Sequence, residues 1–101
     1  MKNLSVKQKQ YLKGYAHNLN PVVTIGDKGL TSAVLKEIKL NLSAHELIKI
    51  RVLGDDRELR LQLIDEICHK TECHFVQHIG KLIVVYKAND KKKKINLVNI
   101  K

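Results

Sequence analysis

The fold is decided by one apolar stretch that runs through two glycines into a helix start: Pro21-Val22-Val23-Thr24-Ile25-Gly26-Asp27-Lys28-Gly29-Leu30-Thr31. The β-branched residues Val22, Val23 and Ile25 suit a buried strand, and proline is tolerated at the first position of a strand. Thr31 is a good N-cap for the helix that follows. We therefore predict a strand, a G-x-x-G loop and a helix in direct succession.

The G-x-x-G loop has two interpretations. It faces the free N–H groups of the next helix, where unpaired donors and the helix dipole favour anions, and Lys28 adds a mobile cation. Gly26 and Gly29 also let a second backbone approach closely, and KH modules clamp an RNA backbone with such a loop. Alternatively, the glycines only supply the positive φ of a tight turn. The motif is common, so charge and neighbouring sequence have to decide.

Length and composition describe one small globular domain. The chain has 101 residues, of which 44% are hydrophobic, enough for a single core. It contains no apolar run long enough to span a bilayer and no signal-peptide core near Met1, so we expect a cytoplasmic protein without a membrane partner. The two cysteines, Cys68 and Cys73, fit a reducing compartment.

The charge is unevenly distributed along the chain. The formal net charge is +9; residues 1–49 carry +5, residues 50–86 carry −1 and residues 87–101 carry +5. A basic half and a basic tail are expected if one side of the protein meets a polyanion. We predict a folded domain over residues 1–88 and a basic C-terminal tail over residues 89–101.

Periodicity predicts three helices among four strands. The first helix begins at a Ser5–Gln8 capping box and ends before Pro21, and two further helices follow Thr31 and Asp55 or Asp56. After the strand at 22–25, strands are expected at 46–53, 74–79 and 82–86. The apolar stripes of the first and third helices are Leu12, Tyr15, Ala16 and Leu19, and Leu59, Leu63, Ile64, Ile67 and Cys68.

This order, α-β-α-β-α-β-β, predicts a two-layer α+β fold with a four-stranded mixed sheet. Right-handed crossovers make the first three strands parallel, with a closing antiparallel hairpin. The strand at 82–86 is apolar throughout and belongs inside the sheet, whereas the alternating strand at 74–79 belongs at its edge. The tail from Asn89 to Lys94 is too charged to pack, although Ile95, Leu97, Val98 and Ile100 fit a short extra strand.

Three blocks of the sequence, together with the whole span from Leu4 to Lys87, resemble the CRM domain (chloroplast RNA splicing and ribosome maturation) in its stand-alone bacterial YhbY-like form. The blocks are Pro21-Val22-Val23 leading into Gly26-Asp27-Lys28-Gly29-Leu30-Thr31, then His45-Glu46-Leu47-Ile48-Lys49-Ile50, then Val76-Gln77-His78-Ile79-Gly80-Lys81 with Tyr86-Lys87. Three blocks in the right order are far more specific than the glycine loop alone.

The resemblance implies a fold similar to the C-terminal domain of bacterial translation initiation factor three, with the last strand between the second and third. It also implies RNA binding and, for single-domain bacterial members, association with precursors of the large ribosomal subunit. Asp27 stands where family members commonly carry a neutral or basic residue. An acid there disfavours a side-chain contact with phosphate but leaves the neighbouring backbone donors.

The sequence gives little support for a metal site or a catalytic site. Cys68, His69, Cys73 and His74 lack the C-x-x-C spacing of a zinc site, and Cys68 fits the apolar stripe of its helix. His45 and Glu46 have no assignable nucleophile, and a histidine at a helix end commonly caps it. The phosphate-loop, zinc-protease and nucleophile-elbow motifs are not found. We expect neither an enzyme nor a cofactor, metal or small-molecule substrate.

We therefore predict contact with the phosphates and sugars of structured RNA. Aromatic residues are few, and Tyr15 and Tyr86 are expected in the core, which argues against base stacking on the sheet. The expected RNA-binding residues are Gly26, Asp27, Lys28, Gly29, Lys7, Lys9, Lys13, Lys91, Lys92, Lys93 and Lys94. A solvated face on the first helix and a solubility tail remain open alternatives for these lysines. A protein-binding adaptor on ribosomal particles and a DNA-packaging protein are the rival functions.

Overall fold

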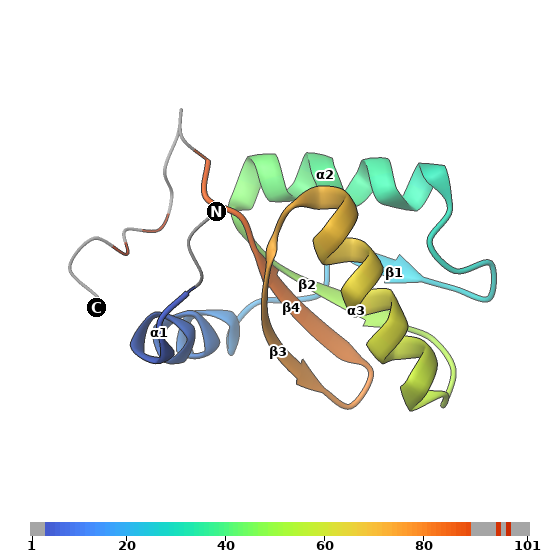
Figure 1. The fold of residues 1–101 in the computed structure, drawn as a ribbon, viewed down its shortest axis with the longest axis horizontal. Helices are drawn as coiled ribbons and strands as arrows, with labels where there is room; N and C mark the ends of the chain where they lie inside the picture. Colours follow the sequence, from blue (N-terminus) through green and yellow to red (C-terminus); the bar gives the residue numbers. More distant parts are fainter. Residues whose placement is uncertain (1–3, 90–94, 96, 98–101) are drawn as a thin grey trace.

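Among the residues that the structure describes, seven elements follow one another in the predicted order (Figure 1). The computed structural model describes residues 4–89, 95 and 97. The elements are α1 (Val6–Ala16), β1 (Val23–Ile25), α2 (Ser32–His45), β2 (Leu47–Val52), α3 (Arg57–Thr71), β3 (His74–Ile79) and β4 (Leu82–Tyr86). The predicted fold class is confirmed. The expectations for Lys91, Lys92, Lys93 and Lys94, and for Val98 and Ile100, lie outside the described residues.

The four strands form one mixed sheet in the order β1-β2-β4-β3. β1 pairs with β2 in parallel, and β4 pairs antiparallel with both β2 and β3. The three earlier strands therefore run in one direction and β4 runs against them. The prediction that β4 lies inside the sheet is confirmed, because Ile83, Val84, Val85 and Tyr86 are all buried.

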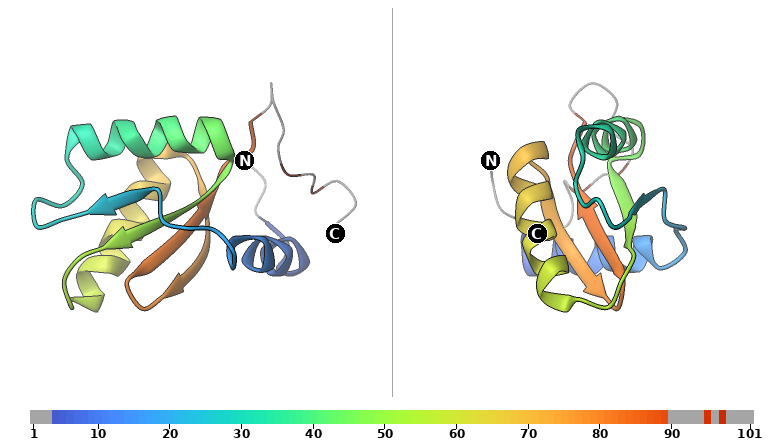
Figure 2. Two further views of the ribbon diagram at one scale, coloured as in Figure 1. Left: turned by 180° about the vertical axis from the view of Figure 1, so that it is seen from behind. Right: turned by 90° about the vertical axis from the view of Figure 1, so that its right-hand side faces the viewer.

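The two faces of the sheet carry different helices. α2 and α3 cover one face, where Ile38, Leu42, Leu63 and Ile67 meet strand residues such as Ile50. α1 covers part of the opposite face, where Leu12 and Ala16 pack on Leu47, Val76, Val84 and Tyr86. The views in Figures 1 and 2 place α1 at the end of the sheet remote from the β1–α2 loop. Within residues 4–89, α1 is the element that covers this second face, and it covers only that end.

Three residues expected in the core are exposed. The exposed fraction is 47% for Tyr15, 40% for Val22 and 43% for Leu59. α1 touches the sheet along a narrow strip, so Tyr15 lies on its flank. The side chain of Val23 faces the core under α2 and α3, so the preceding Val22 points to the opposite face, although its N–H donates to the carbonyl of Lys49 at 3.0 Å. On α3, Leu59 is exposed and the neighbouring Arg60 is buried; the Nε of Arg60 donates a hydrogen bond to His78 Nε2 at 3.1 Å.

Glu46 ends α2 and does not begin β2 as expected. Its φ of 64° breaks the helix, and its fully buried carboxylate accepts hydrogen bonds from two backbone groups further along the chain. The donors are the N–H of Asn89 at 2.6 Å and the N–H of Ile95 at 2.7 Å. Asn89 therefore packs against the domain, and Ile95 is buried beside Leu12 in the cluster under α1. Neither Ile95 nor Leu97 belongs to a strand.

Candidate nucleic-acid interface

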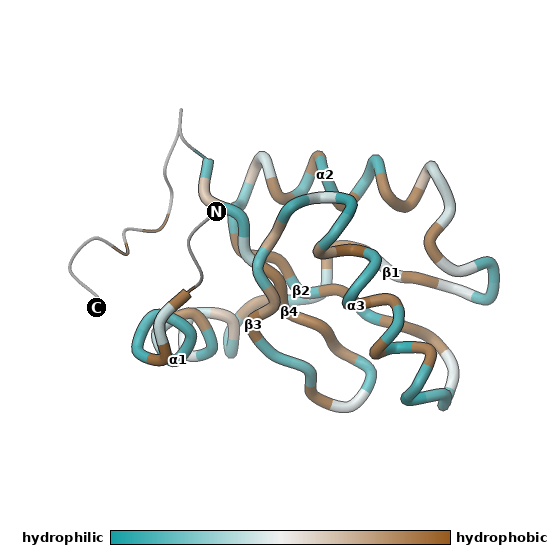
Figure 3. Tube along the Cα trace, in the orientation of Figure 1, coloured by the Kyte–Doolittle hydropathy of each residue, from teal (hydrophilic) through white to brown (hydrophobic). Residues whose placement is uncertain are grey.

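The G-x-x-G loop joins β1 to α2 as the sequence predicts. Ile25 still belongs to the sheet, since its carbonyl accepts from the N–H of Leu53 at 2.9 Å. The loop closes through the N–H of Gly29, which donates to the carbonyl of Gly26 at 3.0 Å. Residues 26–28 are exposed at the tip, which is hydrophilic in Figure 3. The loop therefore presents backbone and Lys28 to solvent.

The two glycines of the loop differ. Gly29 has a φ of 70°, which disfavours any residue with a side chain, so the turn explains why position 29 is a glycine. Gly26 has no positive φ, and a Cβ added there would meet nothing within 4 Å. Neither left-handed backbone nor local crowding accounts for a glycine at position 26. The absence of a side chain at Gly26 leaves the backbone between β1 and α2 accessible on its outer side.

Thr31 fixes the loop to the start of α2. Its Oγ1 accepts a hydrogen bond from the N–H of Val34 at 3.2 Å, which confirms the predicted N-cap. Replacing Thr31 by alanine is expected to lower the free energy of unfolding by about 1 kcal/mol, because the N–H of Val34 loses its acceptor. Urea unfolding followed by circular dichroism measures this. Thr31→Ser keeps the hydroxyl and should stay close to wild type; equal loss in both variants would contradict the capping role.

The lysine and tyrosine side chains of α1 lie on different flanks of the helix. Since Leu12 and Ala16 face the sheet, the 3.6-residue period puts Lys9 and Lys13 on one flank and Tyr11 and Tyr15 on the other. Lys7 lies further round, on the outward face. Lys9 lies on the β3 side of α1. Burial lowers the pKa of His74, at the start of β3, and the positive charge of Lys9 also lowers it. Of the three predicted lysines, only Lys9 and Lys13 therefore border the sheet.

Two cations on β2 were missed by the sequence analysis. Lys49 and Arg51 alternate with the buried residues Ile48, Ile50 and Val52, so they point to the face that α1 covers only in part. Lys49 and Lys13 line the same small hollow, of about 110 Å³, together with His17. We call Lys13, His17, Lys49 and Arg51 the sheet-face patch. The Ile-Lys-Ile-Arg-Val alternation was the signal that could have found it.

The structure does not bring the G-x-x-G loop and α1 into one cluster. They lie at opposite ends of the sheet in both Figure 1 and Figure 2. β2 runs between them: Leu47 packs beneath α1, while Arg51 pairs in register with Thr24 on β1, just before the loop. Lys49 and Arg51 therefore lie between Lys13 and the loop, along a surface that none of the helices among the described residues covers.

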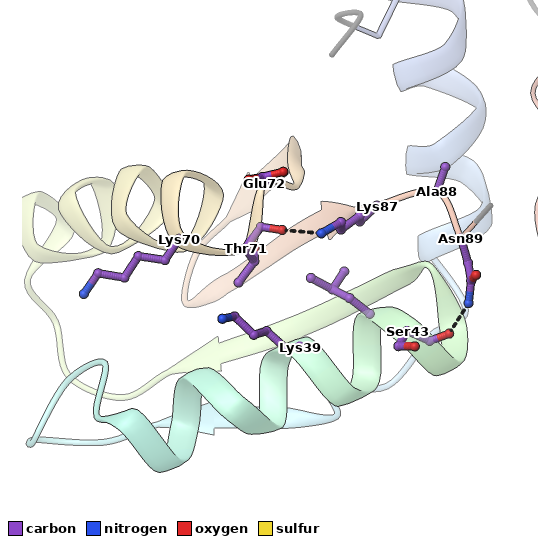
Figure 4. A pocket seen from close by; sticks show the side chains of 9 residues that line it. Lys39, Ser43, Lys70, Thr71, Glu72, Lys87, Ala88 and Asn89 are labelled. Atoms are coloured by element: carbon purple, nitrogen blue, oxygen red, sulfur yellow. Dashed lines mark hydrogen bonds between the residues drawn. The ribbon is translucent and has the colours of Figure 1, made fainter. Parts of the chain in front are cut away.

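A larger hollow lies between α2 and α3 (Figure 4). Its volume is about 550 Å³, and Lys39, Lys70 and Lys87 are among its lining residues. Two of these ammonium groups already have partners: Lys87 Nζ donates to the carbonyl of Thr71 at 2.9 Å, and Lys70 pairs with Glu66 at 3.8 Å. This hollow lies among the helices on the other side of the sheet and is separate from the sheet-face patch.

The cysteine and histidine residues do not form a ligand set. Within residues 4–89, 95 and 97, no group of three or more His, Cys, Asp and Glu side chains is placed to hold a metal. Cys68 and Cys73 share a hydrogen bond, with their Sγ atoms 3.7 Å apart. This bond and burial raise the pKa of Cys68, while the same bond lowers the pKa of Cys73. Among the helices of that same portion, none has the length and apolar character to cross a bilayer.

Comparison with known proteins gives a consistent result. The CRS1/YhbY (CRM) domain matches residues 4–87 of this chain. An RNA-binding protein of Haemophilus influenzae is 50% identical over 93 residues, covering 92% of this chain and 94% of that protein. A probable RNA-binding protein of Pseudomonas aeruginosa is 41% identical over 97 residues, covering 96% and 92% of the two chains.

A solved structure resembles this fold throughout. It is the solution structure of a hypothetical protein from Staphylococcus aureus, described as a candidate RNA-binding protein. The TM-score is 0.81 at 35% sequence identity, and the match covers 92% of this chain and 97% of that one. The similarity therefore extends over nearly the full length of both chains.

Proposed function

The chain belongs to the CRS1/YhbY (CRM) domain family, and on that premise we propose that it binds structured RNA through the sugar-phosphate backbone. The G-x-x-G loop is the point of closest approach, with Gly26 and Gly29 giving access and Lys28 pairing with phosphate. The sheet-face patch and Lys9 extend the contact towards α1. The RNA is ribosomal, and the protein acts in the cytoplasm during assembly of the large subunit.

The observation that carries the proposal is the bare backbone at Gly26. Neither a positive φ nor a crowded neighbour requires a glycine there, yet the position lies at the exposed tip beside Lys28 and before the N-terminus of α2. A missing side chain there allows a second backbone to reach the free N–H groups of that helix. An anionic backbone is the ligand that such groups favour.

The charges support the same surface. Lys13, Lys49 and Arg51 follow the uncovered face of the sheet towards the loop, and the chain as a whole carries +9. Phosphate contacts of this kind position a nucleic acid without reading its sequence. An RNA with a defined folded shape would therefore be recognised by the spacing between the loop and the patch, in agreement with a ribosomal target.

Gly26 gives a direct test. Gly26→Leu places a side chain in open space, so the fold should be unaffected, while affinity for protein-free ribosomal RNA should fall by about tenfold or more. Filter binding at low salt measures the affinity, and thermal unfolding checks the fold. Gln62→Leu adds a leucine at an exposed position of α3 and should leave binding unchanged. Equal affinities for Gly26→Leu and wild type would refute the role of the loop.

The rival functions predict different binding. A protein-binding adaptor on ribosomal particles would fail to bind protein-free ribosomal RNA even at low salt. A DNA-packaging protein would bind duplex DNA as tightly as RNA, whereas a surface matched to folded RNA should distinguish A-form from B-form geometry.

A further inference from the structure

We propose that the hollow between α1 and the beginning of β2 receives one unstacked nucleobase of the bound RNA, with Tyr15 as the stacking ring and Lys49 on the adjoining phosphate. This inference rests on the proposed RNA binding and adds a base-specific contact to it. It also reverses the expectation that Tyr15 belongs to the core.

The hollow has the size and lining of a small-ligand site. Its volume is about 310 Å³, at the lower end of the range of roughly 300–1,000 Å³ for ligand pockets. Tyr15, Leu19 and Val22 supply apolar surface, and Asn20, His45 and Lys49 supply polar groups. The amide of Asn20 can both donate and accept, as the edge of a nucleobase requires.

The ring of Tyr15 is exposed because of the way α1 sits. Leu12 and Ala16 occupy the contact with the sheet, so Tyr15 projects from the flank of the helix that faces β1. Tyr11 lies one turn earlier, and the two ring centroids are 6.5 Å apart with the planes tilted by 45°. This contact restrains the Tyr15 ring and leaves 47% of the residue open to solvent. A restrained, exposed ring that shares a hollow with a lysine, here Lys49, fits a nucleobase stacking platform.

Lys49 connects the hollow to the path of the RNA backbone. It lines both this hollow and the smaller one that contains Lys13 and His17. A chain of phosphates crossing the sheet-face patch would therefore pass the mouth of the hollow at Lys49. No acidic residue is found among the described residues that line it. The positive charge of Lys49 therefore favours a nucleic acid over a basic or neutral peptide as the occupant.

The test compares bases with abasic sites. The probe is a hairpin RNA with a five-nucleotide single-stranded extension, made either with uridines or with abasic ribose phosphates of equal charge. Wild type should bind the uridine probe about fivefold or more tightly, because one base stacked on an aromatic ring contributes at least that factor. Tyr15→Ala should bind the two probes equally, and Tyr15→Phe should retain the preference. Circular dichroism confirms that each variant is folded.

The outcomes separate the two proposals. Equal affinity of wild type for both probes would overturn the nucleobase site and leave RNA binding intact. A preference that persists in Tyr15→Ala would overturn the assignment to Tyr15. Failure of wild type to bind either probe, or ribosomal RNA, would overturn RNA binding itself. Displacement of the uridine probe by an acidic peptide but not by free uridine oligonucleotide would assign the hollow to a protein partner.

Discussion

Replacing Glu46 by alanine is expected to lower the free energy of unfolding by about 3 kcal/mol. This is the largest effect on stability that we predict for a single substitution. The carboxylate is fully buried and accepts from the N–H groups of Asn89 and Ile95. Removing an acceptor from a buried donor costs about 1 to 3 kcal/mol. The loss also releases Ile95 from the cluster under α1. Urea unfolding at neutral pH measures the change.

Two further variants divide this effect into its causes. Glu46→Gln keeps one acceptor oxygen and should lose about half as much. Glu46→Gly loses the carboxylate but relieves the φ of 64°, a strain of about 1 to 3 kcal/mol for a residue with a side chain. It should therefore be more stable than Glu46→Ala. Glu37→Ala, at an exposed position of α2, is the control. Loss of less than about 0.5 kcal/mol in Glu46→Ala would show that the carboxylate does not hold the C-terminal segment.

Neutralising Lys9, Lys13 and Lys28 together is expected to produce the largest effect on RNA binding. Each lost phosphate contact reduces the slope of log affinity against log salt by about 0.7 to 0.9, so three contacts reduce it by about two units or slightly more. Affinity in 0.1 M salt should fall by roughly a hundredfold, with little effect near 1 M salt. Binding of protein-free ribosomal RNA over a salt series measures both quantities.

The same measurement tests the cations found only in the structure. Lys49→Gln with Arg51→Gln should reduce the slope by one to two units, about as much as two phosphate contacts contribute. The control is Lys36, Lys39 and Lys70 changed to glutamine, which removes the same charge as the first triple variant from the α2 and α3 side of the molecule. That control should keep the wild-type slope. An equal reduction of the salt slope in the first triple variant, the Lys49–Arg51 double variant and the control would mean that net charge alone drives binding.

Local sequence was sufficient wherever a feature depends on neighbours along the chain. The structure confirms the capping box of Ser5 and Gln8 and the caps Thr31 and Asp56. These caps were predictable because each hydrogen bond joins residues only three positions apart. The continuous apolar run at 82–86 correctly indicated a strand buried on both faces. The G-x-x-G loop was also placed correctly, since a buried strand before it and a capped helix after it leave the glycines at the sheet's edge.

Residues whose environment depends on distant contacts were misjudged. Tyr15 fitted the apolar stripe of its helix, yet only Leu12 and Ala16 of α1 are buried, because the helix crosses one end of the sheet. Arg60 is buried and donates a hydrogen bond to His78, 18 residues away. Neither outcome can be read from helical periodicity, which says which residues share a face but not how much of that face is covered.

The sequence by itself determined the seven elements, their order, the mixed sheet and the basic glycine loop, because periodicity, capping and chain reversal are local properties. The tertiary structure alone decided that α1 lies on the face opposite α2 and α3, that its lysines are remote from the loop, and that Lys49 and Arg51 lie between them. It also placed the Glu46 carboxylate against backbone groups 43 and 49 residues away. These features arise from the packing of segments distant in the chain, and no local pattern encodes which face a helix will cover.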